Sequence, residues 1–125
     1  MVVVEPGALI PPAFRPFPSS VVVPCGWLRR QLQGQRDGLA GRLDEFWPDV
    51  RDSAWLGGRG EGWERLPYWL DGAIPLAWLL NDTAMQARLR GYLDQILARQ
   101  APDGWLGPRP EDCPEAADLW SQMLM

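Results

Sequence analysis

The chain has 125 residues, 46% of them hydrophobic, and a formal net charge of −4. This length suits one domain with its own apolar core, and the acidic balance disfavours a nucleic-acid partner, because phosphate binding needs a basic face. The chain contains no histidine, so it cannot assemble a Ser-His-Asp or Cys-His catalytic group by itself. No apolar run approaches the ~18 residues that span a bilayer, and the N-terminus lacks a basic signal-peptide region. We therefore expect a cytoplasmic protein without a membrane partner.

Two residue types are informative. Cys25 and Cys113 lie far apart and fit neither a zinc-ligand spacing nor a disulfide framework, although a single bridge between them stays open. We expect no metal site and no cofactor in this chain. Eight tryptophans are many for a small core. An indole ring offers a flat apolar face and one N–H donor, which suits stacking on sugar rings as well as packing in a core.

In chain order, residues 1–26 are predicted to form an extended arm, because prolines recur through them. Val21–Val23 either pairs as a strand or lies on the domain. Apolar residues at helical spacing predict a helix over Trp27–Phe46, weakened by glycines so that a break is expected near Asp37–Gly41. Pro48 is predicted to end this segment.

A glycine-rich loop is expected over Asp49–Glu61. A phosphate-binding role for it is disfavoured, since no Gly-Lys-Ser/Thr sequence follows and no strand precedes it. The next helix is predicted over Leu66–Leu80. Its apolar residues recur at steps of three and four and fill much of the remaining surface, so we expect it to be covered on more than one side. Pro75 is expected to kink it by removing the hydrogen bond to Asp71.

A short connection, Asn81-Asp82, predicts an antiparallel pair of helices, with Asp82 as N-cap of an amphipathic helix over Thr83–Gln100. A turn-rich loop, Ala101–Pro110, follows. A last helix is predicted from Pro114, also buried, with Leu119, Trp120 and Met123 on its apolar face together with Ala116. The chain ends inside this helix.

Helices with a single apolar face alternate along the chain with helices that are apolar on most sides. This alternation favours an all-α fold with outer and inner layers. We interpret residues 27–125 as about four helices from the N-terminal portion of an (α/α) six-hairpin toroid, truncated inside an inner helix. Both long loops run from an outer helix to an inner one, so Trp63 and Trp105 should lie at the same end of the bundle. Loops rich in Trp, Asp, Glu and Gly at one end predict the functional face.

The stretches WLRRQLQGQRDGLAGRLDEFWPDV, GEGWERLPYWLDGAIPLAWLLND and YLDQILARQAPDGWLGP resemble the N-terminal part of the β-L-arabinofuranosidase-like glycoside hydrolases, family 127. The resemblance covers about residues 16–125. It implies a helical barrel that acts on furanose glycosides, with a zinc-associated cysteine nucleophile and a glutamate acid/base from later in the barrel. Those motifs match no position here, and neither Cys25 nor Cys113 has the right surroundings.

We therefore expect a glycoside hydrolase fragment that provides sugar contacts but no catalytic residue. The candidate substrate-binding residues are Glu61, Trp63, Tyr68, Asp71, Asp103 and Trp105. The expected partner is a carbohydrate, and association through an exposed apolar face is a second expectation. Two alternatives stay open. One is a toroid like those of terpene cyclases or prenyltransferases. Gln100–Trp105 resembles the Gln…Gly-x-Trp repeat of the cyclases, but it lacks the residue between Gly and Trp. The other is a non-catalytic, Trp-rich module that binds a sugar or a partner.

Overall fold

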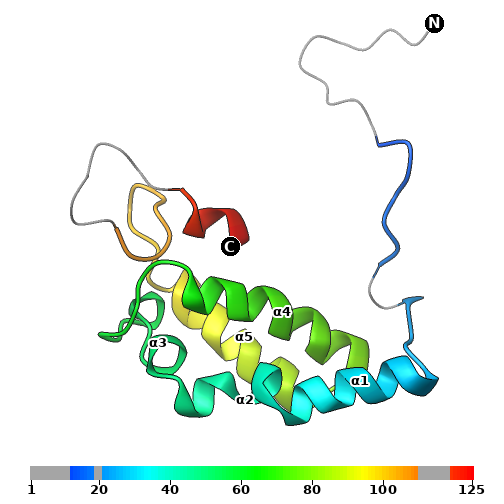
Figure 1. The fold of residues 1–125 in the computed structure, drawn as a ribbon. Coiled ribbons are helices and arrows are strands. Elements are labelled where there is room, and N and C mark those ends of the chain that lie inside the picture. Colours follow the sequence, from blue (N-terminus) through cyan, green and yellow to red (C-terminus); the bar gives the residue numbers. More distant parts are fainter. Residues whose placement is uncertain (1–11, 19–20, 110–118) are drawn as a thin grey trace, which may run out of the picture.

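The computed structural model describes residues 12–18, 21–109 and 119–125, which form helices and loops without a strand. The α-helices are α1 (Gly26–Asp37), α2 (Leu39–Phe46), α3 (Pro48–Arg51), α4 (Arg65–Leu80) and α5 (Thr83–Leu97). Two 3-10 helices, η2 (Ala54–Leu56) and η3 (Ser121–Leu124), complete the described elements (Figure 1). The all-α class is thus confirmed for these residues. No helix among them is long and apolar enough to cross a membrane.

The first helical segment breaks where its glycines predicted. α1 ends at Asp37 and α2 begins at Leu39. A Cβ atom at Gly41 would lie 1.8 Å from the carbonyl oxygen of Arg36, so the close approach of the two helices requires glycine there. The prediction that the helical segment ends at Pro48 was wrong in one respect. Pro48 is the first residue of the short helix α3, where its missing N–H leaves no hydrogen bond unmade.

α4 lies at the centre of the core and is covered on more than one side, as the sequence predicted, because α1, α2, α3, α5 and η3 all pack against it. Its buried side chains are Leu66, Pro67, Trp69, Leu70, Ala73, Leu76, Ala77 and Leu80. One stripe along the helix is exposed and contains Arg65, Tyr68, Asp71, Gly72 and Pro75. The apolar pattern identifies side chains that favour burial, whereas coverage depends on how many elements pack around the helix. α4 is continuous through Pro75, and a kink there stays a prediction.

α4 and α5 form the predicted antiparallel pair (Figure 1). Asn81 adopts a left-handed conformation with φ of 54°, which reverses the chain within two residues. Asp82 Oδ1 accepts a hydrogen bond from the Met85 backbone N–H at 3.0 Å, so the predicted N-cap is confirmed. Met85, Leu89 and Ile96 then bury the α5 face that packs on α4.

The two ends of the chain depart from the predictions in different ways. The expected helix from Pro114 lies largely outside the described residues, and so do Ala116 and Cys113. Where the chain is described again, only η3 is helical, and Leu119, Trp120 and Met123 are 60%, 47% and 68% exposed. The predicted buried face is therefore wrong for these residues, because this end of the chain packs mainly against α4 and is not enclosed by a second layer of helices. Val21–Val23 is exposed and pairs with no strand among the described residues.

Candidate functional site

The two long loops meet at one end of the bundle, as the sequence predicted. Trp55 is 1% exposed, and its ring lies against the backbone of Gly107 from the second loop. Its Nε1 donates a hydrogen bond to the carbonyl oxygen of Trp63 at 3.1 Å. A Cβ atom at Gly62 would lie 3.2 Å from the ring of Pro108. Trp55 thus joins the loop before α4 to the loop after α5.

Three of the predicted site residues lie on or next to the exposed stripe of α4. Trp63 precedes the helix and is 48% exposed, and Tyr68 is 45% exposed. Asp71 is also exposed, one turn after Tyr68. Glu64 lies one turn before Tyr68, and its Oε2 accepts a hydrogen bond from Trp120 Nε1 at 2.8 Å. We call these five residues, Trp63, Glu64, Tyr68, Asp71 and Trp120, the aromatic strip.

Glu61 has a structural role in this arrangement. Its Oε1 accepts the backbone N–H of Glu64 at 2.9 Å, and its Oε2 accepts that of Arg65 at 3.0 Å. Both N–H groups belong to the start of α4 and have no partner within the helix. The Glu61 carboxylate therefore caps α4. A substrate contact by the same side chain stays a prediction.

Asp103 and Trp105 form a separate local group with Arg109. Asp103 pairs with Arg109 and accepts the backbone N–H of Trp105 at 3.1 Å. These contacts, the backbone hydrogen bond first, lower the pKa of Asp103 below its ordinary value. The Arg109 guanidinium lies 4.9 Å from the centre of the Trp105 ring, at cation–π distance. One face of Trp105 therefore has a cation as its neighbour.

Sequence reasoning missed Trp55 and Trp120 as organising residues. Trp55 occurs in a glycine-rich stretch that periodicity cannot interpret, and Trp120 was assigned to a helix core. The pairing of Trp120 with Glu64 joins residues 56 positions apart. A one-dimensional pattern contains no signal for such a contact.

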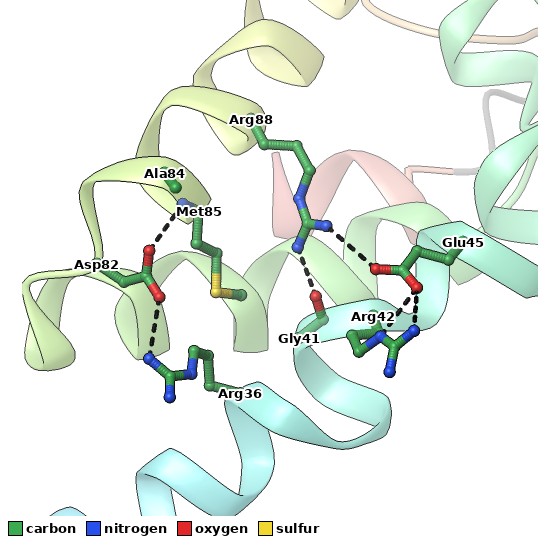
Figure 2. A pocket seen from close by; sticks show the side chains of 8 residues that line it. All are labelled: Arg36, Gly41, Arg42, Glu45, Asp82, Ala84, Met85 and Arg88. Carbon is green, nitrogen blue, oxygen red and sulfur yellow. Dashed lines mark hydrogen bonds and ion pairs between the residues drawn. The ribbon is translucent and has the colours of Figure 1, made fainter.

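A further pocket, of about 270 Å3, lies between the α1–α2 junction and α5 (Figure 2). Three arginines line it, yet each already has a carboxylate partner. Arg36 pairs with Asp37 and Asp82, and Arg42 pairs with Glu45. Asp82 has a pKa below its ordinary value, first because it accepts the Met85 N–H and then because of Arg36. These charges neutralise one another, so the pocket does not favour a free anion.

The third arginine, Arg88, connects this pocket to a buried carboxylate. Arg88 donates to the carbonyl oxygen of Gly41, and its Nε lies 3.5 Å from Asp44 Oδ2. The Asp44 side chain is 3% exposed and accepts a hydrogen bond from Tyr92 Oη at 2.8 Å. Burial, and then the bond to Asp44, raises the pKa of Tyr92 to about 12. This cluster ties α2 to α5.

Within residues 12–18, 21–109 and 119–125, no three His, Cys, Asp or Glu side chains are grouped to hold a metal ion. Comparison of the chain with protein-family models, with curated proteins and with solved structures found no match. The assignment of function therefore depends on the geometry of the site and on the resemblance noted above.

Proposed function

We propose that this chain binds carbohydrate through the aromatic strip, without performing catalysis itself. The observation that supports this most directly is the exposure of aromatic rings and carboxylates near the start of α4, where Trp120 also donates a hydrogen bond to Glu64. Trp63, Tyr68 and Trp120 are each 45–48% exposed there. Glu64 is the N-cap residue of α4, and Asp71 lies within the helix on its exposed stripe.

This combination suits sugars for a physical reason. The C–H face of a sugar ring stacks on an aromatic ring, while carboxylate oxygens accept hydrogen bonds from the hydroxyl groups around its edge. The strip contains both kinds of group. Tyr68 adds a phenolic hydroxyl, which both donates and accepts hydrogen bonds.

We further propose that the chain forms the N-terminal portion of an (α/α) toroid resembling β-L-arabinofuranosidases, with the strip on its substrate-facing end. The resemblance of residues 16–125 and the meeting of the two long loops at one end support this arrangement. The described residues do not fit the zinc site that the resemblance implies, since no group of three ligands is present among them. The proposal therefore includes no metal.

Isothermal titration of the chain with arabinofuranosides tests this function. We expect saturable, millimolar binding, weakened about fivefold to tenfold by Trp63→Ala or Tyr68→Ala, because one aromatic contact contributes about 1 kcal/mol. Trp27→Ala is the matched control. Trp27 is 69% exposed and is the second residue of α1, a helix that begins at the end of the bundle away from the loops (Figure 1).

Parallel titration with a prenyl diphosphate separates the terpene cyclase alternative. Tighter binding of the diphosphate than of any arabinofuranoside would favour that alternative. Absence of saturable sugar binding, or equal loss of affinity in the Trp27 control, would contradict the proposal.

A further inference from the structure

Exposed apolar side chains gather in the N-terminal segment, which we define as residues 12–18 and 21–30. They are two phenylalanines, Phe14 and Phe17, the three valines of Val21–Val23, and Trp27 with Leu28. The two phenylalanines are 90% and 82% exposed. No other described stretch of similar length exposes as many large apolar groups. Contact of these groups with water is unfavourable, so the segment gains from an apolar environment.

The same part of the chain is strongly basic. Residues 12–36 contain four arginines and no acidic residue. The rest of the chain contains eight arginines and all 16 acidic residues, so its formal charge is −8. Arg15, Arg29 and Arg30 have no carboxylate partner among the described residues. Their positive charge is therefore not neutralised by the acidic body of the molecule.

Pro24 attaches the apolar residues near α1 to the folded body. Its ring is buried, whereas Val23 and Cys25 on either side of it are exposed. α1 begins two residues later, and none of its side chains is buried. Figure 1 shows residues 12–18, in blue, outside the helical bundle. The N-terminal segment thus presents its apolar and basic groups at the surface, at the end of the bundle where α1 begins.

We propose that the N-terminal segment binds the surface of an anionic lipid bilayer. Phe14, Phe17 and Trp27 enter the boundary between headgroups and acyl chains, a position that aromatic rings favour. The unpaired arginines contact the anionic headgroups. The expectation of no membrane partner was based on the lack of a spanning run, and binding at a membrane surface needs no such run.

A bilayer suits this segment better than a protein does. The apolar side chains are spread over a stretch with four prolines, and a fluid interface accepts them without a complementary shape. A protein partner needs a matching groove, with acidic groups in register with the arginines. The chain's own acidic body is one such surface, but the three arginines do not pair with it. A second copy presents the same body without the advantage of being linked to the segment, so it is disfavoured further.

Vesicle flotation of the full chain tests the electrostatic contribution. We expect the chain to float with vesicles of phosphatidylcholine that contain about 30% phosphatidylserine, and not with phosphatidylcholine alone. Arg15→Gln, Arg29→Gln and Arg30→Gln together should raise the dissociation constant for the anionic vesicles about a hundredfold, which is about fivefold for each arginine.

A second triple variant provides the matched control for charge. Arg42→Gln, Arg51→Gln and Arg59→Gln change the net charge by the same amount from exposed positions outside the segment. Vesicle binding by this variant should be nearly unchanged, because the effect of a charge on an anionic surface decays within about 10 Å. Equal weakening in the two triple variants would overturn the proposal, since binding would then follow net charge alone.

Phe17→Ser combined with Trp27→Ser tests the apolar contribution. Both side chains are largely exposed, so circular dichroism should be unchanged while the dissociation constant for the anionic vesicles rises about tenfold or more. Leu39→Ser combined with Leu97→Ser is the matched control, because these residues are 68% and 58% exposed outside the segment. The same rise in the control, or no rise in the Phe17 and Trp27 variant, would overturn the proposal.

Two further results decide against a bilayer. One is a wild-type chain that floats with neither kind of vesicle, or equally with both. The other is tighter binding to polyglutamate, a soluble acidic polypeptide, than to the anionic vesicles, which would favour a protein partner instead.

Discussion

Trp55 and Gly107 touch across the two loops that meet at one end of the bundle. A Cβ atom at Gly107 would lie 2.2 Å from the Trp55 ring, and Gly107 itself has a φ of +79°. Glycine is thus required there both for the backbone conformation and for the space it leaves. The contact positions the loop that holds Trp105 against the loop that holds Trp63.

Gly107→Ala is accordingly expected to destabilise the fold by about 2–4 kcal/mol, from the left-handed backbone and from overlap with the indole ring. Gly104→Ala is the matched control, because Gly104 has a φ of +90° and a Cβ atom there would meet no other atom within 4 Å. It should cost about 1–2 kcal/mol. Urea unfolding measures both values, and equal losses would show that the Trp55 contact is unimportant.

Because of Tyr92, the free energy of unfolding is expected to decrease as pH rises into the alkaline range. Its pKa is about 12 in the folded chain, through burial and the bond to Asp44, against about 10 in an unfolded chain. The folded pKa is raised, so this contribution is fully present below pH ~10 and is lost as pH rises toward 12. The free energy of unfolding in urea should therefore fall more steeply between these pH values in the wild type than in Tyr92→Phe. If the free energy of unfolding fell equally with pH in the wild type and in Tyr92→Phe, Tyr92 would not be the cause of this pH dependence.

Arg88 and Arg42 both line the pocket of Figure 2, yet they should differ in their effect on stability. Arg88→Met leaves the buried Asp44 carboxylate without its cation, and we expect a loss of about 2–3 kcal/mol. Arg42→Met removes a pairing with Glu45 in which both side chains are largely exposed, so almost no change in stability is expected. Thermal unfolding should rank them in this order; the reverse order would contradict the buried role of Asp44.

Glu61→Ala should cost about 1 kcal/mol, since the carboxylate accepts two backbone N–H groups at the start of α4. Asp94→Ala, on the solvent-facing side of α5, is the control and should change the free energy of unfolding by less than about 0.5 kcal/mol. Sugar titration of the same variant separates the two roles of Glu61. Lost affinity with unchanged stability would indicate substrate contact rather than capping.

Local chemistry was predictable from the sequence. The Asp82 N-cap, the break between α1 and α2 and the antiparallel α4–α5 pair each depend on residues close together in the chain. Short-range hydrogen bonds and backbone preferences determine such features, so residue type and spacing are enough. The shared end of the two long loops also followed, because the order of the helices constrains where each connection must lie.

The tertiary structure alone decided which side chains are available at the surface. It left the stripe of α4 containing Tyr68 and Asp71 exposed, used both oxygens of Glu61 as a cap, and set Trp120 beside Glu64. The sequence determined that α4 is strongly apolar and that aromatic residues cluster before it. Exposure depends on contacts between residues far apart in the chain, and a local pattern records only which side chains favour burial, not which neighbours arrive to cover them.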